Sequence, residues 1–202
     1  MKKKILALFA AILLAVVFVP AYASADLYFA TNVGGQEYRW DPPAGSVGSV
    51  FQVGLNPFTV YKLGVFDWGG NGLIDSHPVA IFNADKSLLV SATVSAGTSA
   101  TLDQGFRWVS LSSPVTLSAN TQYAIAAYYP GTNDHMGSTA TINPAFTITG
   151  SGYVDGLPTV GYPETPYIPL YGANMATPIP AAVWLLGTGL VGLFGIRRRF
   201  VS

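Results

Sequence analysis

Phe58-Thr59-Val60-Tyr61-Lys62-Leu63-Gly64-Val65-Phe66 is the part of the sequence that points most directly to a fold class. β-Branched and aromatic residues fill this stretch, and such residues favour β-strands. Residues 78–82 are similarly apolar, and the turn Asn83-Ala84-Asp85-Lys86 joins them to residues 87–94. These two segments are therefore predicted to pair as a β-hairpin.

Similar short runs recur outward from this centre, separated by Gly and Pro clusters at about the 8–12-residue spacing of all-β domains. They lie at residues 46–53, 106–111, 115–117, 121–129, 145–149 and 167–175. Helical periodicity does not appear in this region, and residues 150–169 are predicted to form a long loop. About eight or nine strands over residues 26–176 predict one all-β domain, an antiparallel, jelly-roll-like β-sandwich.

The composition excludes several classes of function. The 202 residues include no cysteine, which excludes a disulfide framework, a cysteine nucleophile, a Cys-based metal site and lipoprotein anchoring. Six of the ten basic residues lie near the two ends of the chain, and the rest carries four basic and ten acidic side chains. Because nucleic-acid binding needs a basic face, this acidic middle argues against it.

The N-terminus has the three parts of a secretory signal. A basic start, Met1-Lys2-Lys3-Lys4, precedes an apolar run over residues 5–19 and the segment Pro20-Ala21-Tyr22-Ala23-Ser24-Ala25. We expect residues 1–25 to be a signal peptide, cut after Ala23 or Ala25. An uncleaved anchor is the alternative, but the apolar run is short for one.

The C-terminus carries Pro178-Ile179-Pro180-Ala181, an apolar run over residues 181–196, and Arg197-Arg198-Arg199. As a helix the run would span roughly 24 Å, slightly less than the ~30 Å hydrocarbon core of a bilayer. The arginines would stay cytoplasmic and leave the domain outside. Residues 177–202 are thus predicted to form a transmembrane sorting helix with a basic tail, or alternatively a plain one-span anchor.

This tail resembles the PEP-CTERM class of bacterial sorting signals, in its VPLPA-type variant. The resemblance covers about the last 25 residues and rests on the proline motif (Pro178, Ile179, Pro180, Ala181) and the basic cluster (Arg197, Arg198, Arg199). The chain departs from the variant at Thr177, where Val is usual, and at Ile179, where Leu or Glu is usual. The resemblance implies an exosortase-like sorting enzyme as a partner and association with a cell surface or exopolysaccharide matrix.

The middle of the chain is similar to the DUF4082-like sandwich found in PEP-CTERM proteins. The matching segments span about residues 47–129 and are Leu63-Gly64-Val65-Phe66-Asp67, Asn71-Gly72-Leu73, residues 76–82, Phe106-Arg107-Trp108-Val109 and residues 114–123. This resemblance implies a sandwich fold and brings no activity with it.

A loop between two predicted strands, residues 67–75, is a candidate calcium site. Asp67, Asn71 and Asp75 place oxygen donors at positions 1, 5 and 9, and Gly72 stands at position 6, where an EF-hand loop turns sharply. Position 3 is Gly69 and position 12 is Pro78, which are not calcium ligands in such loops. The alternative is a turn rich in Gly, Asn and Asp, with side chains that cap backbone groups. Apart from calcium, no cofactor is expected.

Aromatic residues suggest a second candidate site, for glycans, at Trp68, Asn71 and His77. Trp68 lies in the Gly-rich turn, where an indole could stack on a sugar, although other aromatics, such as Trp108 and Tyr123, fit a core better. Binding by a β-sandwich module would here be an analogy of architecture alone.

A catalytic site has weaker support. His77 and His135 are the only histidines, and Asp67, Asp75 and Asp134 are nearby carboxylates in sequence that could complete an acid–base pair. The sequence contains none of the G-x-S-x-G, H-E-x-x-H or phosphate-loop motifs.

These observations predict a non-enzymatic protein that is exported by a secretion translocase. The C-terminal helix would anchor it in the membrane, and processing would leave it at the cell surface or in the extracellular matrix, in contact with exopolysaccharide or biofilm. The alternatives are a carbohydrate-binding module, with or without structural calcium, and a glycan-active enzyme.

Overall fold

The computed structural model of the chain describes residues 26–40, 44–131 and 134–178, and these residues form an all-β, antiparallel domain. A single 3-10 turn, η1 (Trp68–Gly70), is the only helical element that they contain. None of the described residues belongs to a helix with the length and apolarity that a membrane span needs. The predicted signal peptide, and the sorting segment from residue 179 onward, lie outside the described residues.

Strands account for most of the described chain. Their bounds are β1 (Asp26–Tyr28), β2 (Ala30–Arg39), β3 (Gly45–Val53), β4 (Phe58–Phe66), β5 (His77–Asn83), β6 (Leu88–Val94), β7 (Thr101–Asp103), β8 (Phe106–Leu117), β9 (Gln122–Tyr129), β10 (His135–Ile142), β11 (Phe146–Asp155), β12 (Thr165–Pro166) and β13 (Ala173–Pro178).

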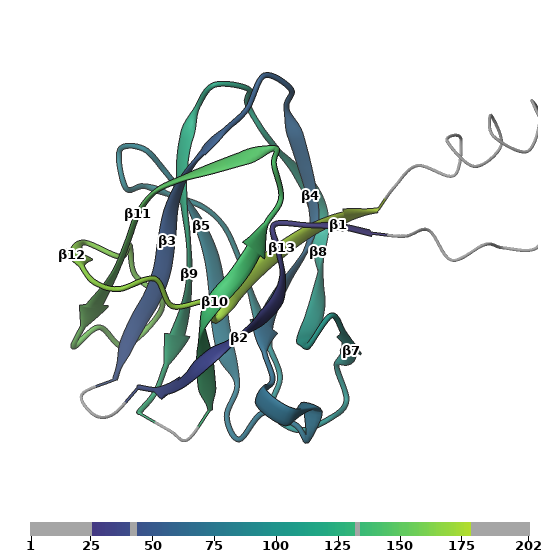
Figure 1. Cartoon of the computed structure of the whole chain (residues 1–202), viewed down its shortest axis with the longest axis vertical. Coiled ribbons are helices and arrows are strands. Elements are labelled where there is room, and N and C mark those ends of the chain that lie inside the picture. The colour runs from purple at the N-terminus through teal and green to yellow at the C-terminus, as the bar shows by residue number, and fades with distance from the viewer. Residues whose placement is uncertain (1–25, 41–43, 132–133, 179–202) are drawn as a thin grey trace, which may run out of the picture. The chain divides into compact units, whose positions relative to one another are not determined.

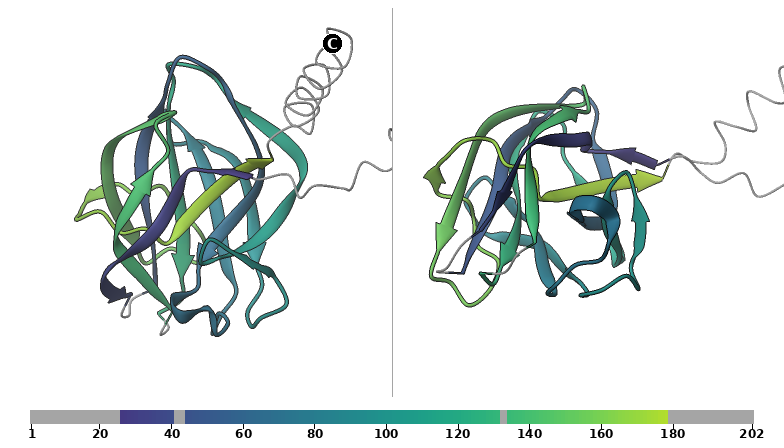
Figure 2. Two further views of the ribbon diagram at one scale, coloured as in Figure 1. Left: turned by 45° about the vertical axis from the view of Figure 1, so that its right-hand side comes forward. Right: turned by 60° about the horizontal axis from the view of Figure 1, so that its bottom comes forward.

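The strands form three sheets. A six-stranded sheet has the order β12-β11-β3-β9-β5-β6, a five-stranded sheet has the order β1-β13-β4-β8-β7, and β10 pairs with β2 alone. Figures 1 and 2 show the two larger sheets facing each other, with β2 and β10 alongside them. The domain is therefore sandwich-like.

The core fills the space between the two large sheets. Residues of β3 and β4 fill it, among them Val47, Phe51, Val60 and Leu63, all almost fully buried. Phe29, Phe51 and Phe146 stack edge to face or at a tilt, with ring centroids 4.9 to 5.4 Å apart. Burial of this apolar surface is the main force that holds the sheets together.

A second, smaller core lies on the outer face of the six-stranded sheet. Residues 156–170, which we call the strap, cross that face, and their Val160 and Tyr162 pack on Phe82 and neighbouring alanines. The Gly161 N–H donates to the buried Ser46 hydroxyl at 2.9 Å. Because the strap covers the outer face, β9 is buried on both sides, which explains its nearly continuous run of apolar residues.

Several sequence-based expectations are confirmed. Strand β4 has the predicted bounds, and β5 and β6 form the predicted hairpin. Its turn places Lys86 at a φ of 68°, and the Asp85 carboxylate accepts the Ser87 N–H at 3.0 Å.

Other strand predictions were wrong. The predicted strands 106–111 and 115–117 are one strand, β8, because a break in the β4–β8 register between Val60 and Lys62 accommodates Pro114. Strand β11 continues to Asp155, into the predicted loop, and the last strand begins at Ala173 rather than at residue 167. Strands β2 and β10 were not predicted, because both are rich in Gly and polar residues, which do not favour β-strands.

The first and last strands are neighbours. In the five-stranded sheet β13 lies between β1 and β4, and the Phe29 N–H donates to the Met175 carbonyl at 2.9 Å. Lys62 pairs with Asp26 of β1, and its ammonium lies 4.5 Å from the centre of the Trp108 ring. The two ends of the domain thus leave it at the same edge (Figure 1).

Candidate functional site

The loop between β4 and β5 holds most of the residues that the sequence singled out. It begins at Asp67, passes through η1, and reaches β5 at His77. Gly72 has a φ of 106°, a conformation that side-chain-bearing residues rarely adopt. A Cβ at this position would also lie 2.9 Å from Thr98, so the loop requires glycine here.

A buried ion pair closes the start of this loop. The Asp67 carboxylate accepts the Arg107 Nε–H at 2.7 Å and the Gly72 N–H at 3.0 Å. The other guanidinium nitrogens of Arg107 donate to the carbonyls of Thr98, Ala100 and Gly70 at 2.9 to 3.1 Å. Arg107 therefore joins two loops. The only feature of the sequence that could have indicated this role is a charged residue within an otherwise aromatic strand.

A second buried pair closes the end of the loop. Asp134 lies just before β10, and its carboxylate contacts His77 Nε2 at 2.8 Å. The same carboxylate accepts the backbone N–H groups of Ile74 and Asp75 at 2.9 and 3.0 Å. His77 exposes none of its surface, and its ring lies 4.9 Å from that of Tyr129.

Each ring nitrogen of His77 contacts an oxygen atom. Its Nδ1 lies 2.8 Å from the Tyr128 carbonyl oxygen, which accepts hydrogen bonds but cannot donate one. Its Nε2 faces a carboxylate that already accepts two N–H groups. Both ring nitrogens of His77 therefore lie at hydrogen-bond distance from an acceptor.

His77 also acts on Asp134. Burial by itself would raise the pKa of the Asp134 carboxyl. The hydrogen bonds from His77, Ile74 and Asp75, together with the electrostatic interaction with His77, outweigh burial and hold that pKa below its usual value.

The predicted calcium ligands have different surroundings. Asp67 points inward to Arg107, Asn71 is exposed, and the N–H of Asp75 binds Asp134. Throughout the described ranges, no group of three or more His, Asp or Glu residues is placed to hold a metal ion. The loop geometry thus matches the alternative reading, a turn with side chains that cap backbone groups, while calcium binding stays a prediction.

The predicted glycan-binding residues do not share one surface. Trp68 is half-buried, with its ring edge to face with Phe66 at 5.8 Å, and Asn71 is exposed nearby in the loop. His77 is buried in its ion pair, so a sugar at Trp68 would not touch it.

The two histidines also lie in separate surroundings. His135 contacts Glu37 across the β2–β10 pair, whereas His77 contacts Asp134. Among the residues that the structure describes, one carboxylate contacts each ring, and the His135 pair is open to solvent whereas the His77 pair is buried.

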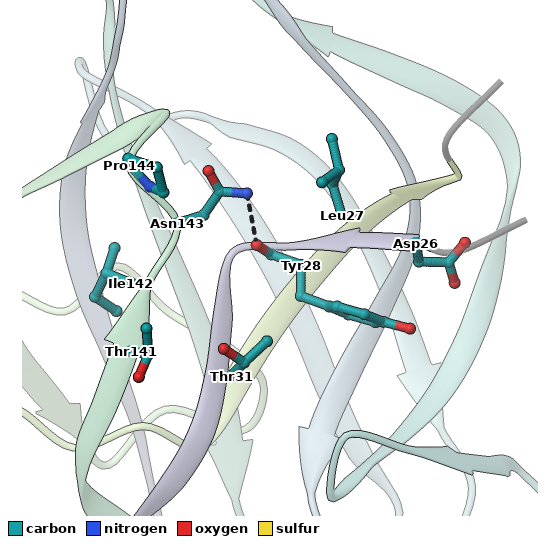
Figure 3. Close-up of a pocket in the computed structure, with 8 residues that line it drawn as sticks. All are labelled: Asp26, Leu27, Tyr28, Thr31, Thr141, Ile142, Asn143 and Pro144. Carbon is teal, nitrogen blue, oxygen red and sulfur yellow. Dashed lines mark hydrogen bonds between the residues drawn. The ribbon is translucent and has the colours of Figure 1, made fainter. Parts of the chain in front are cut away.

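A shallow pocket of about 370 Å³ lies beside β1. Figure 3 shows Leu27, Ile142 and Pro144 around it, with the Asn143 amide donating to the Tyr28 carbonyl at 3.0 Å. Its one carboxylate, Asp26, pairs with Lys62. The lining includes none of the residues that the sequence selected, and an acid–base pair free to act on a substrate is not among its side chains.

The chain was compared with known proteins. No family model matches it, and no curated protein sequence matches it.

Proposed function

We propose that this protein is an exported, non-enzymatic component of a cell surface or extracellular matrix. The observation that carries the proposal is that the paired part of the last strand ends just before the proline motif. The register that joins β13 to β4 stops at Ala176, and the motif begins at Pro178.

The pairing of the first and last strands supports processing at both points. Met175 and Ala176 of β13 are buried, whereas Thr177 is only half-buried. A cut near residues 177–181 would leave the core intact. A cut after Ala25 would leave Asp26 able to pair with Lys62, which is consistent with a signal peptidase acting there.

The PEP-CTERM resemblance supplies the sorting step of the proposal. A secretion translocase would export the chain, the C-terminal helix would hold it in the membrane, and an exosortase-like enzyme would act near Pro178-Ile179-Pro180. We also propose that the sandwich is jelly-roll-like. The number of strands supports this proposal, and the two large sheets face each other, as a jelly roll requires.

Intact mass spectrometry of the protein from its native host, in membrane and medium fractions, tests this proposal. We expect a species that starts near Ser24 or Asp26 and ends between residues 177 and 181. Replacement of Pro178, Ile179 and Pro180 by alanine should block the C-terminal cut. The matched control is Pro158→Ala, in the exposed part of the strap, which should be processed normally.

A species from both fractions that retains Arg197, Arg198 and Arg199 would identify a plain one-span membrane protein and exclude sorting. Normal maturation of the triple-alanine variant would also contradict the proposed motif.

A further inference from the structure

Three aromatic residues that are distant in sequence meet on one flank of the domain. Trp40 follows β2, Tyr153 lies in β11 and Tyr167 follows β12. The ring centroids of Trp40 and Tyr153 are 5.2 Å apart, and those of Tyr153 and Tyr167 are 5.5 Å apart. We call these three residues the aromatic row. Figure 1 shows β11 and β12 together on this side of the domain, with the end of β2 below them.

The row is partly exposed to solvent. Tyr167 is 46 % exposed and the adjacent Ile168 is 44 % exposed, while Trp40 and Tyr153 are half-buried. Burial of large aromatic side chains is energetically favourable, so a contiguous group of them at the surface often marks a binding site.

The backbone holds the row in place. Thr165 and Pro166 pair with Tyr153 and Gly152, and the Tyr167 N–H donates to the Ser151 carbonyl at 3.0 Å. The strap on the other side of this pairing is anchored by its own small core. A ligand would therefore meet a preformed surface and would not have to order a mobile loop.

Polar groups border the row. A Cβ on Gly45 would lie 2.5 Å from an Asp155 carboxylate oxygen and 2.7 Å from the Trp40 indole nitrogen, so both groups lie over this glycine. Asp155 is exposed and can accept hydrogen bonds. Apolar ring faces beside a hydrogen-bond acceptor match the two sides of a pyranose, its C–H groups and its hydroxyls.

We propose that the aromatic row binds an uncharged polysaccharide. Charge is what selects this ligand: the chain between its two basic ends carries four basic and ten acidic side chains, which disfavours anionic polymers. Lys86, a cation on the strap side, is paired with Glu164, and Arg39 is the residue before Trp40. This inference rests on the proposed function, because it assumes that the protein is located in a polysaccharide matrix. It places the glycan contact at the aromatic row instead of at Trp68, Asn71 and His77.

Affinity electrophoresis tests this inference with matrix polysaccharide from the native host, separated into neutral and acidic fractions by anion exchange. The mature protein should be retarded in gels that contain the neutral fraction. Tyr167→Ala should weaken the apparent affinity about tenfold, and Trp40→Ala should weaken it as well. Tyr167→Phe should retain it, because the ring remains. Tyr61→Ala is the matched control, since Tyr61 is 42 % exposed on β4 in the other large sheet, and it should bind as the wild type does.

Retardation by the neutral fraction should persist at about 0.5 M salt, because the contacts are not ionic. No retardation by the neutral fraction, retardation only by the acidic fraction, or equal retardation of Tyr167→Ala and wild type would each overturn the inference. These outcomes are independent of the mass measurement that tests the proposed function. Either proposal can therefore be contradicted while the other is confirmed.

Discussion

Single residues determine how the loop between β4 and β5 is held. Asp67 and Arg107 fix its start, and His77 and Asp134 fix its end, all at or below 7 % side-chain exposure. A buried charge is costly unless it is paired and hydrogen-bonded. Each of these four side chains therefore depends on its partner.

Arg107→Met should destabilise the domain strongly, since Asp67 would be left buried without its cation. We expect a loss of about 3–5 kcal/mol in the free energy of unfolding, measured by urea denaturation. The matched control is Lys86→Met, which removes an ion pair that is 54 % exposed on both sides and should change the free energy of unfolding far less. Equal losses in the two variants would contradict the role given to Arg107.

The Asp134 carboxylate should make stability depend on pH at the acid end. Its pKa is held below the usual value of about 3.9, so its stabilisation is complete above that pH and is lost as pH falls through the lower folded-state pKa. Asp134→Asn should therefore be less stable at neutral pH and lose less stability on acidification, as measured by urea midpoints against pH.

Asp85→Asn is the comparison for that experiment. The pKa of Asp85 is also lowered, by hydrogen bonds from the Ser87 hydroxyl and N–H, but its carboxylate is fully exposed. Because solvent screens this exposed group, its replacement should change the acid dependence less than Asp134→Asn does.

The protonation of His77 can be observed directly. Nitrogen-15 NMR at neutral pH should show both ring nitrogens protonated, because each faces only an acceptor. A neutral ring with one bare nitrogen would show that the hydrogen-bond assignment is wrong.

Among the elements, the approach to β13 makes a tight contact with the core. A Cβ on Gly172 would lie 2.0 Å from the Tyr129 hydroxyl, which makes no hydrogen bond within the described part of the chain. Gly172→Ala should destabilise by about 1–3 kcal/mol in thermal or urea unfolding. Gly34→Ala, in β2, is the control, because nothing lies within 4 Å of its Cβ position.

Removal of the hydroxyl should relieve part of that clash. Tyr129→Phe alone should be close to neutral, since no bond is lost, and it should reduce the cost of Gly172→Ala when the two are combined. A double variant that loses the full sum of both effects would contradict this account.

The elements also show what the sequence can predict and what it cannot. The pattern of β4 and the turn after β5 are local, so both were predicted correctly. Strands β2 and β10 gain their stability from pairing with each other across about a hundred residues, and no local pattern records that pairing. The Gly- and Asp-rich pattern of the loop after β4 is also local, so the sequence predicts this loop. Arg107 lies 40 positions from Asp67, and no local pattern indicates that the two side chains pair. Asp134 was only one of several carboxylates considered.

For the molecule as a whole, the last strand is a structural necessity. Met175 and Ala173 fill the core, and the Asn174 amide binds both the N–H and the carbonyl of Ala30. A chain that ends at Thr177 should fold, whereas one that ends at Tyr171 should not, as circular dichroism and limited proteolysis would show. Folding of the shorter chain would contradict this role for β13.

The pairing of β1 with β13 also has a consequence in time. A polypeptide emerges N-terminus first, from a ribosome or through a membrane channel, so β1 appears first while its partner appears about 150 residues later. Contacts so distant in sequence form slowly, because a large loop must close before they are gained. The nascent domain therefore stays incomplete, and open to proteases and chaperones, until nearly its whole length has emerged.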